Sequence, residues 1–186
     1  MKILFYLLIL LSLISCEIDN PIYEGLYKLE IPLGFPEPLI PEDNQLNVDR
    51  IELGKRLFFD PILSADSTIS CSSCHKQEYA FADNIAITPG IEGRLGVRNS
   101  MSLANVAYND FFLREGGVPT LEMQVLAPIQ DHNEMDFNII PVAERMKLDS
   151  SYVAQSLKAY NREPDAFVIT RAISAFERTL ISGNSN

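Results

Sequence analysis

The stretch Cys71-Ser72-Ser73-Cys74-His75 constrains this chain more than any other part of its sequence. Two thiols three residues apart, followed directly by a histidine, are typical of the attachment site of a c-type haem. Each thiol bonds one vinyl group of the porphyrin, and the adjacent imidazole ligates the iron from the proximal side. We therefore predict one covalently bound haem c in this chain, held by Cys71, Cys74 and His75.

Three other interpretations of the motif fit less well. A zinc site needs four ligands, and outside the motif the sequence offers only His132 and Cys16 as nitrogen or sulfur ligands. A thioredoxin-like redox pair belongs on a βαβ pattern, which this sequence lacks. A disulfide between residues this close would close too small a loop to add much stability.

The N-terminus predicts export from the cytoplasm. Met1-Lys2 precedes an apolar run over residues 3–14, which is too short to span a bilayer and is placed as the core of a signal peptide. The run ends in a segment, residues 13–16, that resembles the lipobox of a bacterial lipoprotein. That resemblance implies cleavage before Cys16 and a lipid on its thiol, whereas ordinary secretory cleavage nearby is the alternative. We expect a periplasmic protein that meets the outer membrane only through this lipid anchor.

The composition divides the chain into three predicted segments. Residues 1–15 are the predicted signal peptide, and residues 16–46 are the lipidated cysteine with a tether that holds five of the eleven prolines. Proline restricts the backbone and removes a donor, so the tether is expected to be extended. Residues 47–186 form the predicted haem domain. The formal net charge of −10 argues against a nucleic-acid partner and would suit a basic electron-donor protein.

The hydrophobic pattern predicts an all-α, cytochrome c-like domain of short helices and long loops packed on the haem. Asn47 is the predicted N-cap of a helix over 48–59, and Asp149 and Ser150 are the predicted capping residues of a helix over about 150–160. Loops are predicted over 83–99 and 128–138, and the remaining predicted helices are short ones near 100–105 and 119–126 and a long one from about 166 to 181.

Nine short sequence motifs follow one another between about residue 47 and residue 181. They are Leu53–Pro61, Ile69–His75, Phe81–Asp83, Gly96–Asn99, Leu103–Asn105, Thr120–Gln124, Ala127–Ile129, Glu134–Met135 and Ala175–Leu180. In their order and spacing these motifs resemble the bacterial di-haem cytochrome c peroxidases and their MauG-type relatives. The resemblance covers the N-terminal, peroxidatic half of such enzymes.

The resemblance implies a haem-dependent reduction of hydrogen peroxide to water, with electrons from a small donor such as a cytochrome c. Glu134 would act as acid and base on the distal side of the haem, and Gln124 would assist it by hydrogen bonding. Asn99 would help to hold a calcium ion. Without the resemblance, Glu134 would be an ordinary acidic residue on a solvated loop, one of the 25 acidic residues of the sequence, and Asn99 would be a turn residue. A homodimer is left open as the assembly state.

Three departures from the family pattern change these expectations. No histidine lies between Lys76 and Asp131, where many members carry a distal ligand that leaves on activation, and Ile91 stands about there. We therefore expect a distal side that is permanently open. Arg114 stands where the family often has a tryptophan. No second C-x-x-C-H motif precedes Asn186, so we expect a fragment that lacks the second haem domain, with a genuine single-haem protein as the alternative.

Two other functions remain open from the sequence. A methionine opposite His75 would make the chain a monohaem electron-transfer cytochrome, and the candidates are Met101, Met123, Met135 and Met146. His132 is expected to be a polar loop residue near the distal side. A related enzyme that oxidises an organic or protein substrate would share the same distal chemistry.

Overall fold

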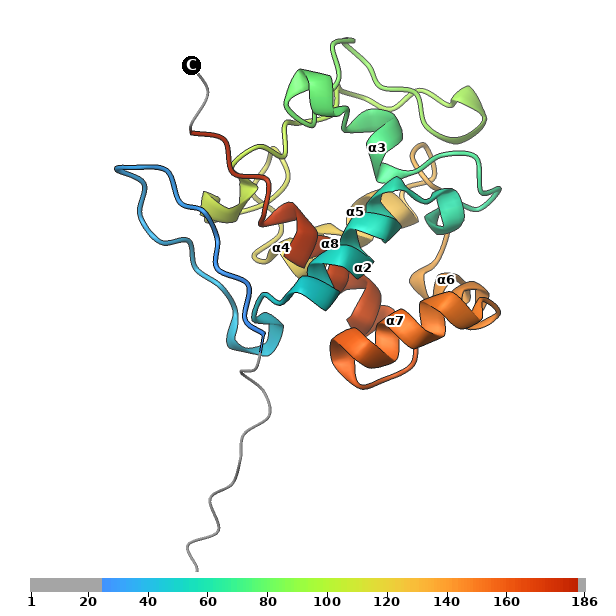
Figure 1. Cartoon of the computed structure of the whole chain (residues 1–186). Coiled ribbons are helices and arrows are strands. Elements are labelled where there is room, and N and C mark those ends of the chain that lie inside the picture. The colour runs from blue at the N-terminus through green and yellow to red at the C-terminus, as the bar shows by residue number, and fades with distance from the viewer. Residues whose placement is uncertain (1–24, 184–186) are drawn as a thin grey trace, which may run out of the picture.

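The computed structural model describes residues 25–183 (Figure 1). The predicted signal peptide, Cys16 and the first part of the tether lie outside the described residues. Between residues 25 and 183 no helix is both long and apolar enough to cross a bilayer. The α-helices are α2 (Val48–Phe59), α3 (Cys71–Cys74), α4 (Leu121–Gln124), α5 (Leu126–Gln130), α6 (Ile139–Lys147), α7 (Ser150–Tyr160) and α8 (Ala166–Glu177). Single turns of 3-10 helix are η1 (Glu42–Asn44), η2 (Pro61–Leu63), η3 (Gln77–Tyr79), η4 (Ile91–Gly93) and η5 (Val106–Tyr108).

The helical fold class is confirmed, since β-structure in the described part of the chain is limited to isolated bridges. Both predicted caps form. The Asn47 side chain accepts a hydrogen bond from Arg50 N at 2.8 Å, and Asp149 accepts one from Ser151 N at 2.8 Å. Each cap satisfies a backbone donor that the first helical turn leaves unpaired. As a result, α2 and α7 begin and end where the sequence predicted.

Other helix boundaries differ from the prediction. The helix near 100–105 is wrong, because Asn105 adopts a left-handed backbone with φ of 62° and only the turn η5 follows it. The segment 119–126 divides into α4 and α5, which meet at Val125. The last helix ends at Glu177, four residues before the predicted end at Ile181. Helix α6 was not predicted, and its N-cap is Asn138, whose side chain accepts from Ile140 N at 2.9 Å.

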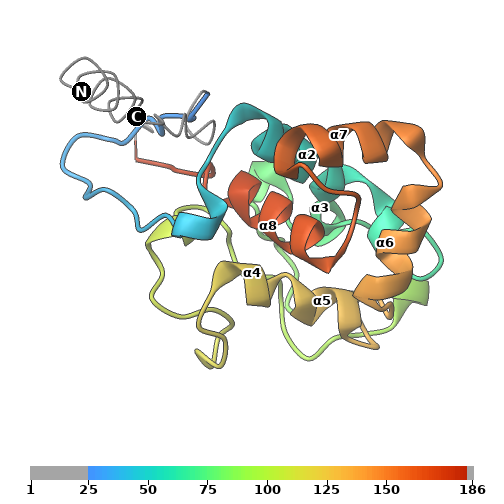
Figure 2. The ribbon, with the colours of Figure 1, turned by 90° about the horizontal axis from the view of Figure 1, so that it is seen from below.

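The centre of the domain is a close crossing of α2 and α8. Figures 1 and 2 both show α8 lying against α2, with α7 beside α2 and with α4 and α5 on the other side of α8. Gly54 permits the approach, because a Cβ built there would lie 1.8 Å from the Ala172 carbonyl oxygen of α8. The largest apolar cluster surrounds this crossing and contains Leu53, Leu57, Val142, Met146, Tyr152, Ile169 and Ile173.

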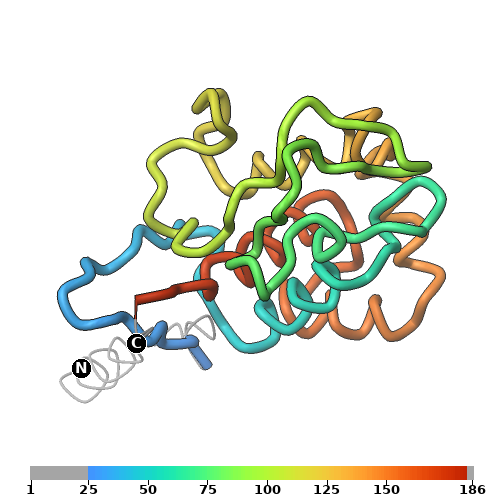
Figure 3. The backbone as a smooth tube through the Cα atoms, turned by 90° about the horizontal axis from the view of Figure 1, so that it is seen from above, coloured from blue at the N-terminus to red at the C-terminus, as the bar shows by residue number. Residues whose placement is uncertain are grey.

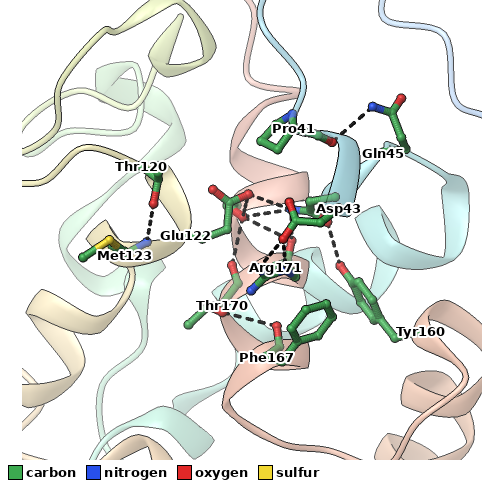
Figure 4. Close-up of polar contacts among 12 residues, drawn as sticks. Pro41, Asp43, Gln45, Thr120, Glu122, Met123, Tyr160, Phe167, Thr170 and Arg171 are labelled. Carbon is green, nitrogen blue, oxygen red and sulfur yellow. Dashed lines mark hydrogen bonds and ion pairs between the residues drawn. The ribbon is translucent and has the colours of Figure 1, made fainter.

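The N-terminal strap, residues 25–46, runs along the outside of the domain before α2 begins (Figure 1). It is extended up to η1, and Tyr27 N donates to Leu46 O at 2.9 Å. The strap ends by inserting Asn44, which is fully buried, against α4 and α8. Asn44 Nδ2 donates to Glu122 Oε1 at 2.8 Å and to Arg171 O at 3.0 Å. Figure 4 shows Glu122 turned toward this contact from α4.

Long loops form the part of the domain that contains α3. The tube in Figure 3 shows the green segments, which include α3 and the chain beyond it, passing over α8 in this view. Arg145 of α6 fixes the chain that leads into α3, since its guanidinium donates to the carbonyl oxygens of Ile62, Ser64 and Ala65 at 2.8–3.1 Å. The cysteine motif is therefore anchored to the helical core on its N-terminal side.

A candidate haem site

A cavity of about 350 Å³ brings together the residues that the sequence singled out. Its wall includes Cys71, Cys74 and His75 from α3 and its C-cap, Gln124 from α4, and Glu134 from the loop after α5. The loop over residues 88–101 and the inner face of α8 complete the wall. All five side chains thus share one concave, mainly apolar space, which is the environment that a porphyrin requires.

The histidine of the motif is held in the orientation that iron ligation needs. His75 Nδ1 lies 2.8 Å from the Phe81 carbonyl oxygen, and because a carbonyl only accepts, Nδ1 carries the proton. The lone pair is therefore on Nε2, which is free to bind a metal. Burial lowers the pKa of His75 and so favours this neutral form, although the backbone contacts with Phe81 and Met101 oppose it. The ring centroid of Phe58 lies 6.4 Å from the centroid of the imidazole ring.

The two thiols are free and uncharged. Both are half-buried and neither forms a disulfide. Burial raises the pKa of both thiols, and for Cys74, with Glu134 adding to the effect, to about 11. Thiols that are this reluctant to ionise suit an uncharged thioether better than a thiolate that binds zinc. Within residues 25–183 no group of three histidine, cysteine or acidic side chains lies close enough to hold a metal ion by itself.

The described residues therefore fit a covalently attached haem c. Cys71 and Cys74 would hold its edge, and His75 would ligate its iron. The fit depends on three observations: the free thiols, the orientation of the imidazole, and the cavity that all three residues line.

Glu134 is positioned by a tight contact between two loops. Ile91 N donates to the Glu134 carbonyl oxygen at 2.8 Å. The contact requires a glycine at position 90, because a Cβ there would lie 2.0 Å from Asn133 O and 2.7 Å from Glu134 Cα. The Glu134 side chain is accessible at the cavity wall, yet partial desolvation by the surrounding protein, with a contribution from Asp131, raises its pKa. A carboxyl group whose pKa is raised in this way holds a proton more readily than an ordinary surface carboxyl, which suits proton transfer.

Gln124 lies on the same cavity wall as Glu134. Its Oε1 is buried and has no hydrogen-bond partner among the described residues. Two contacts hold the short helix that carries it. Thr120 caps α4 by accepting from Met123 N at 3.2 Å, and Glu122 forms a buried ion pair at 2.6 Å with Arg178, the residue directly after α8 (Thr120, Met123 and Glu122 appear in Figure 4). An orphaned amide oxygen on a fixed helix is typical of a group whose partner is a bound molecule.

The remaining predicted residues lie in different places. Asn99 is half-buried on the cavity wall, and its side-chain oxygen and its carbonyl both accept from Arg114 Nη2. A calcium ion at this oxygen would therefore have to displace a guanidinium. Ile91, at the expected position of the missing distal histidine, is buried rather than facing solvent. His132 is exposed and contacts Arg94 and Asp136 at 3.1 Å, outside the cavity wall.

The methionines divide into two groups. Met101 and Met135 line the cavity, so either could approach a metal there. Met123 is 52% exposed, and Met146 is fully buried in the core among α2, α6 and α8, so neither faces the cavity wall.

One residue of this cavity was missed by the sequence reasoning. Glu177, on α8, lines the wall and is only 5% exposed. The pattern contained a sign of it, since Glu177 follows Ile173 by four residues and so shares the apolar face of that helix. A carboxyl group on the buried face of an amphipathic helix needs either a partner or a function.

Comparisons with known proteins identify the family of this chain. Residues 48–186 match the family described as di-haem cytochrome c peroxidase. The chain is 32% identical over 147 residues to the methylamine utilization protein MauG of Methylorubrum extorquens, covering 78% of this chain and 42% of that protein. It is 34% identical over 137 residues to the cytochrome c551 peroxidase of Pseudomonas aeruginosa, covering 72% and 40%.

A solved structure is similar to this chain in fold. The crystal structure of a MauG-like protein associated with microbial copper homeostasis superposes with a TM-score of 0.77 at 33% identity, covering 84% of this chain and 47% of that one. The chain therefore spans less than half the length of each of these three relatives.

Proposed function

The chain belongs to the di-haem cytochrome c peroxidase family, and on this premise we propose that it carries the peroxidatic haem site of a haem-dependent peroxidase. The proposed reaction reduces one hydrogen peroxide to two waters, with two electrons from a cytochrome-type donor and two protons from solvent. The observation that supports it is a single cavity lined by the cysteine motif, by His75 and by Glu134, whose pKa is raised.

Each residue has a distinct part in this proposal. When bound, the haem supplies an iron that exchanges electrons with the peroxide. Cys71 and Cys74 would hold the haem by thioether bonds, and His75 would ligate its iron through Nε2. The carboxyl oxygens of Glu134 accept a proton from one peroxide oxygen and return it to the other, which becomes the leaving water. The orphaned Oε1 of Gln124 accepts a hydrogen bond from the peroxide and orients it.

The test uses the haem-loaded chain with reduced cytochrome c or a small one-electron donor and hydrogen peroxide. Replacing Glu134 with Gln keeps the size of the side chain but removes its exchangeable proton. We expect the rate of donor oxidation to fall about 10²–10⁴-fold. The ferric protein should also give a high-spin spectrum, because His132, the other histidine of the sequence, lies outside the cavity wall.

Glu144→Gln is the matched control. It removes one carboxylate from a side chain that is 65% exposed on α6, away from the cavity. Its rate should equal that of the wild type. A Glu134→Gln protein that contains haem and retains the wild-type rate would refute the proposed role of this carboxyl.

The second candidate function is monohaem electron transfer, and it is favoured by one observation: Met101 and Met135 both line the cavity. In that case the ferric protein would be low-spin, with a sulfur–iron absorption band. This band would disappear in one of the two variants Met101→Leu and Met135→Leu, namely the one that removes the ligand. A high-spin spectrum that both variants leave unchanged would favour the peroxidase instead.

The finer features of the sequence interpretation belong to the same proposal. We propose a periplasmic protein with a lipid on Cys16, a calcium ion at Asn99, and a second haem domain as partner in the complete protein. Support for that second domain comes from the relatives, of which this chain covers about two fifths. Globomycin sensitivity of processing, calcium-dependent haem spectra and the gene sequence beyond residue 186 test these three points separately.

A further inference from the structure

Glu177 is a buried carboxyl group that the proposed mechanism does not use. It lies in the last turn of α8, is 5% exposed, and lines the candidate haem cavity close to Cys71. Its Oε2 is buried and has no hydrogen-bond partner in the part of the chain that the structure describes. A carboxylate in this position would be a buried charge without a counter-ion, which is strongly unfavourable.

The neighbouring cation does not neutralise Glu177. Arg178 is the next residue, but its guanidinium donates to both oxygens of Glu122, at 2.6 and 3.0 Å. Glu122 therefore balances the charge of Arg178 and adds a negative charge of its own near Glu177. Arg178 is thus the one cation beside two carboxyl groups, and it pairs with Glu122. Only Glu122 is therefore held in the ionised form.

The physical consequence is a proton stored beside the cavity. Burial raises the pKa of Glu177 to about 8, with the charge of Arg178 opposing this and that of Glu122 adding to it. The other ionisable groups on the cavity wall are His75, Arg98, Arg114, Glu115, Asp131 and Glu134. Arg98 is paired with Glu115, and Arg114 is engaged by Asn99. This leaves Glu177, Glu134 and Asp131 as the wall carboxyls that neither guanidinium neutralises, and of these three only Glu177 is buried.

We propose that Glu177 is the redox-linked proton acceptor of this haem site. Glu177 takes one proton from solvent, forming an O–H bond at its carboxyl, when a one-electron reductant converts the ferric haem to ferrous. It releases that proton to solvent when the haem is oxidised again. The added electron and the added proton cancel in charge, so the buried pocket keeps the same net charge in both states. The inference depends on the proposed haem site but not on peroxide turnover.

The coupling follows from electrostatics in a pocket of low polarity. A ferric haem carries one more positive charge than a ferrous one, so it stabilises the Glu177 carboxylate and lowers its pKa relative to the ferrous state. Below both of these pKa values Glu177 is protonated in both states, and the reduction potential is independent of pH. Between them one proton accompanies each electron. Above both, the potential is again constant, at a lower value.

The experiment is a spectroelectrochemical titration of the haem-loaded chain, without peroxide, from about pH 6 to pH 10, the range that brackets the Glu177 titration. We expect the wild-type potential to fall by up to 59 mV per pH unit within a window of this range. In Glu177→Gln the potential should be independent of pH through that window and should equal the low-pH value of the wild type. Glu163→Gln, which removes an exposed carboxylate, should retain the wild-type curve.

Three results would overturn the inference: a flat wild-type curve, a Glu177→Gln curve that keeps the wild-type slope, or a slope that is lost in Glu134→Gln instead. If Glu177→Gln does not bind haem, reduced-minus-oxidised infrared spectra of the wild type and of Glu177→Asp decide the question. Reduction should produce the carbonyl band of a protonated carboxyl, shifted in D2O and altered in the Asp variant, and its absence would refute the coupling. Loss of peroxidase activity with an intact slope would count against the proposed function alone.

Discussion

The ion pair between Glu122 of α4 and Arg178, directly after α8, should be the most stabilising polar contact behind the cavity wall that carries Gln124. The two side chains are only 10% and 6% exposed, and the guanidinium donates to both carboxylate oxygens. Asn44 Nδ2 and Ser174 Oγ donate to the same Oε1 at 2.8 and 3.0 Å. A buried pair with this many donors is fully satisfied, so removing one partner leaves the other charge buried without compensation.

The magnitude can be obtained in two ways. Removing one member of a buried, hydrogen-bonded pair costs about 3–5 kcal/mol. Independently, burial alone would raise the pKa of Glu122, but hydrogen bonds and charge from Arg178, with a further bond from Asn44, lower it from 4.5 to about 2. That difference corresponds to about 3 kcal/mol of stability at neutral pH. We therefore expect Glu122→Gln to lower the free energy of unfolding by about 3 kcal/mol.

The pH dependence supplies the sharper test. Because the folded pKa of Glu122 lies below its unfolded value, the stabilisation is complete above about pH 5 and is lost as the pH falls toward 2. Urea unfolding of the haem-loaded chain, followed by circular dichroism, should show a wild-type advantage at pH 7 that shrinks steadily on acidification. The exposed pair of Lys147 and Glu144 provides the control, and Glu144→Gln should change stability by less than about 0.5 kcal/mol.

A loss of less than about 1 kcal/mol for Glu122→Gln at pH 7, the value of an ordinary exposed contact, would contradict this prediction. A loss that is as large at pH 2 as at pH 7 would contradict it as well. The first outcome would mean that Arg178 finds another partner, and the second that the loss comes from packing rather than from charge.

Two glycine substitutions test the fold and the site separately. Gly54→Ala places a methyl group 1.8 Å from a backbone oxygen of α8, so we expect a loss of at least about 1–3 kcal/mol, measured as a lower midpoint of thermal unfolding. An unchanged midpoint would show that α2 and α8 can separate freely. Gly90→Ala collides with the backbone beside Glu134, so the peroxide-dependent rate should fall while haem content, measured by the pyridine haemochrome spectrum, stays constant. Equal losses of haem and of rate would place Gly90 in haem binding instead.

The sequence predicted well wherever a local rule decides the structure. Asn47 and Asp149 were correct N-caps because a short polar side chain can pair a free amide within its own turn. The haem motif was equally local. Two thiols and an imidazole within five residues reach one porphyrin whatever the rest of the chain does, and the structure places all three on one cavity.

The errors have an identifiable physical origin. The predicted helix at 100–105 fails at Asn105, whose left-handed backbone is fixed from outside the segment: its N donates to Leu180 O at 2.7 Å and its side chain contacts Ser182. A local pattern contains no information about a partner 75 residues away. Helix α6 was not predicted because it is short, contains Pro141, and is stabilised by tertiary packing rather than by the helix propensity of its residues.

The roles of the distal residues could not be obtained from spacing alone. Glu134 was singled out by resemblance, and on composition it would have been an ordinary acidic loop residue. What places it on the cavity wall is the contact of its backbone with Gly90 and Ile91, across more than 40 residues of chain. Glu177 was visible as a charge on an apolar helix face, but its lack of a partner depends on Arg178 being engaged by Glu122, which only the tertiary structure shows.

One helix connects the two walls of the cavity. On one side α8 packs against α2 at Gly54, and Phe58 of α2 contacts the imidazole of His75. On the other side Arg178 directly after α8 holds α4, which carries Gln124. The separation between His75 and Gln124 across the cavity therefore depends on the packing of α8 against α2 and on the ion pair that holds α4. It follows that Glu122→Gln, although Glu122 is not a cavity-lining residue, should displace Gln124 more than His75, since it releases α4 while leaving the α2–α8 crossing intact.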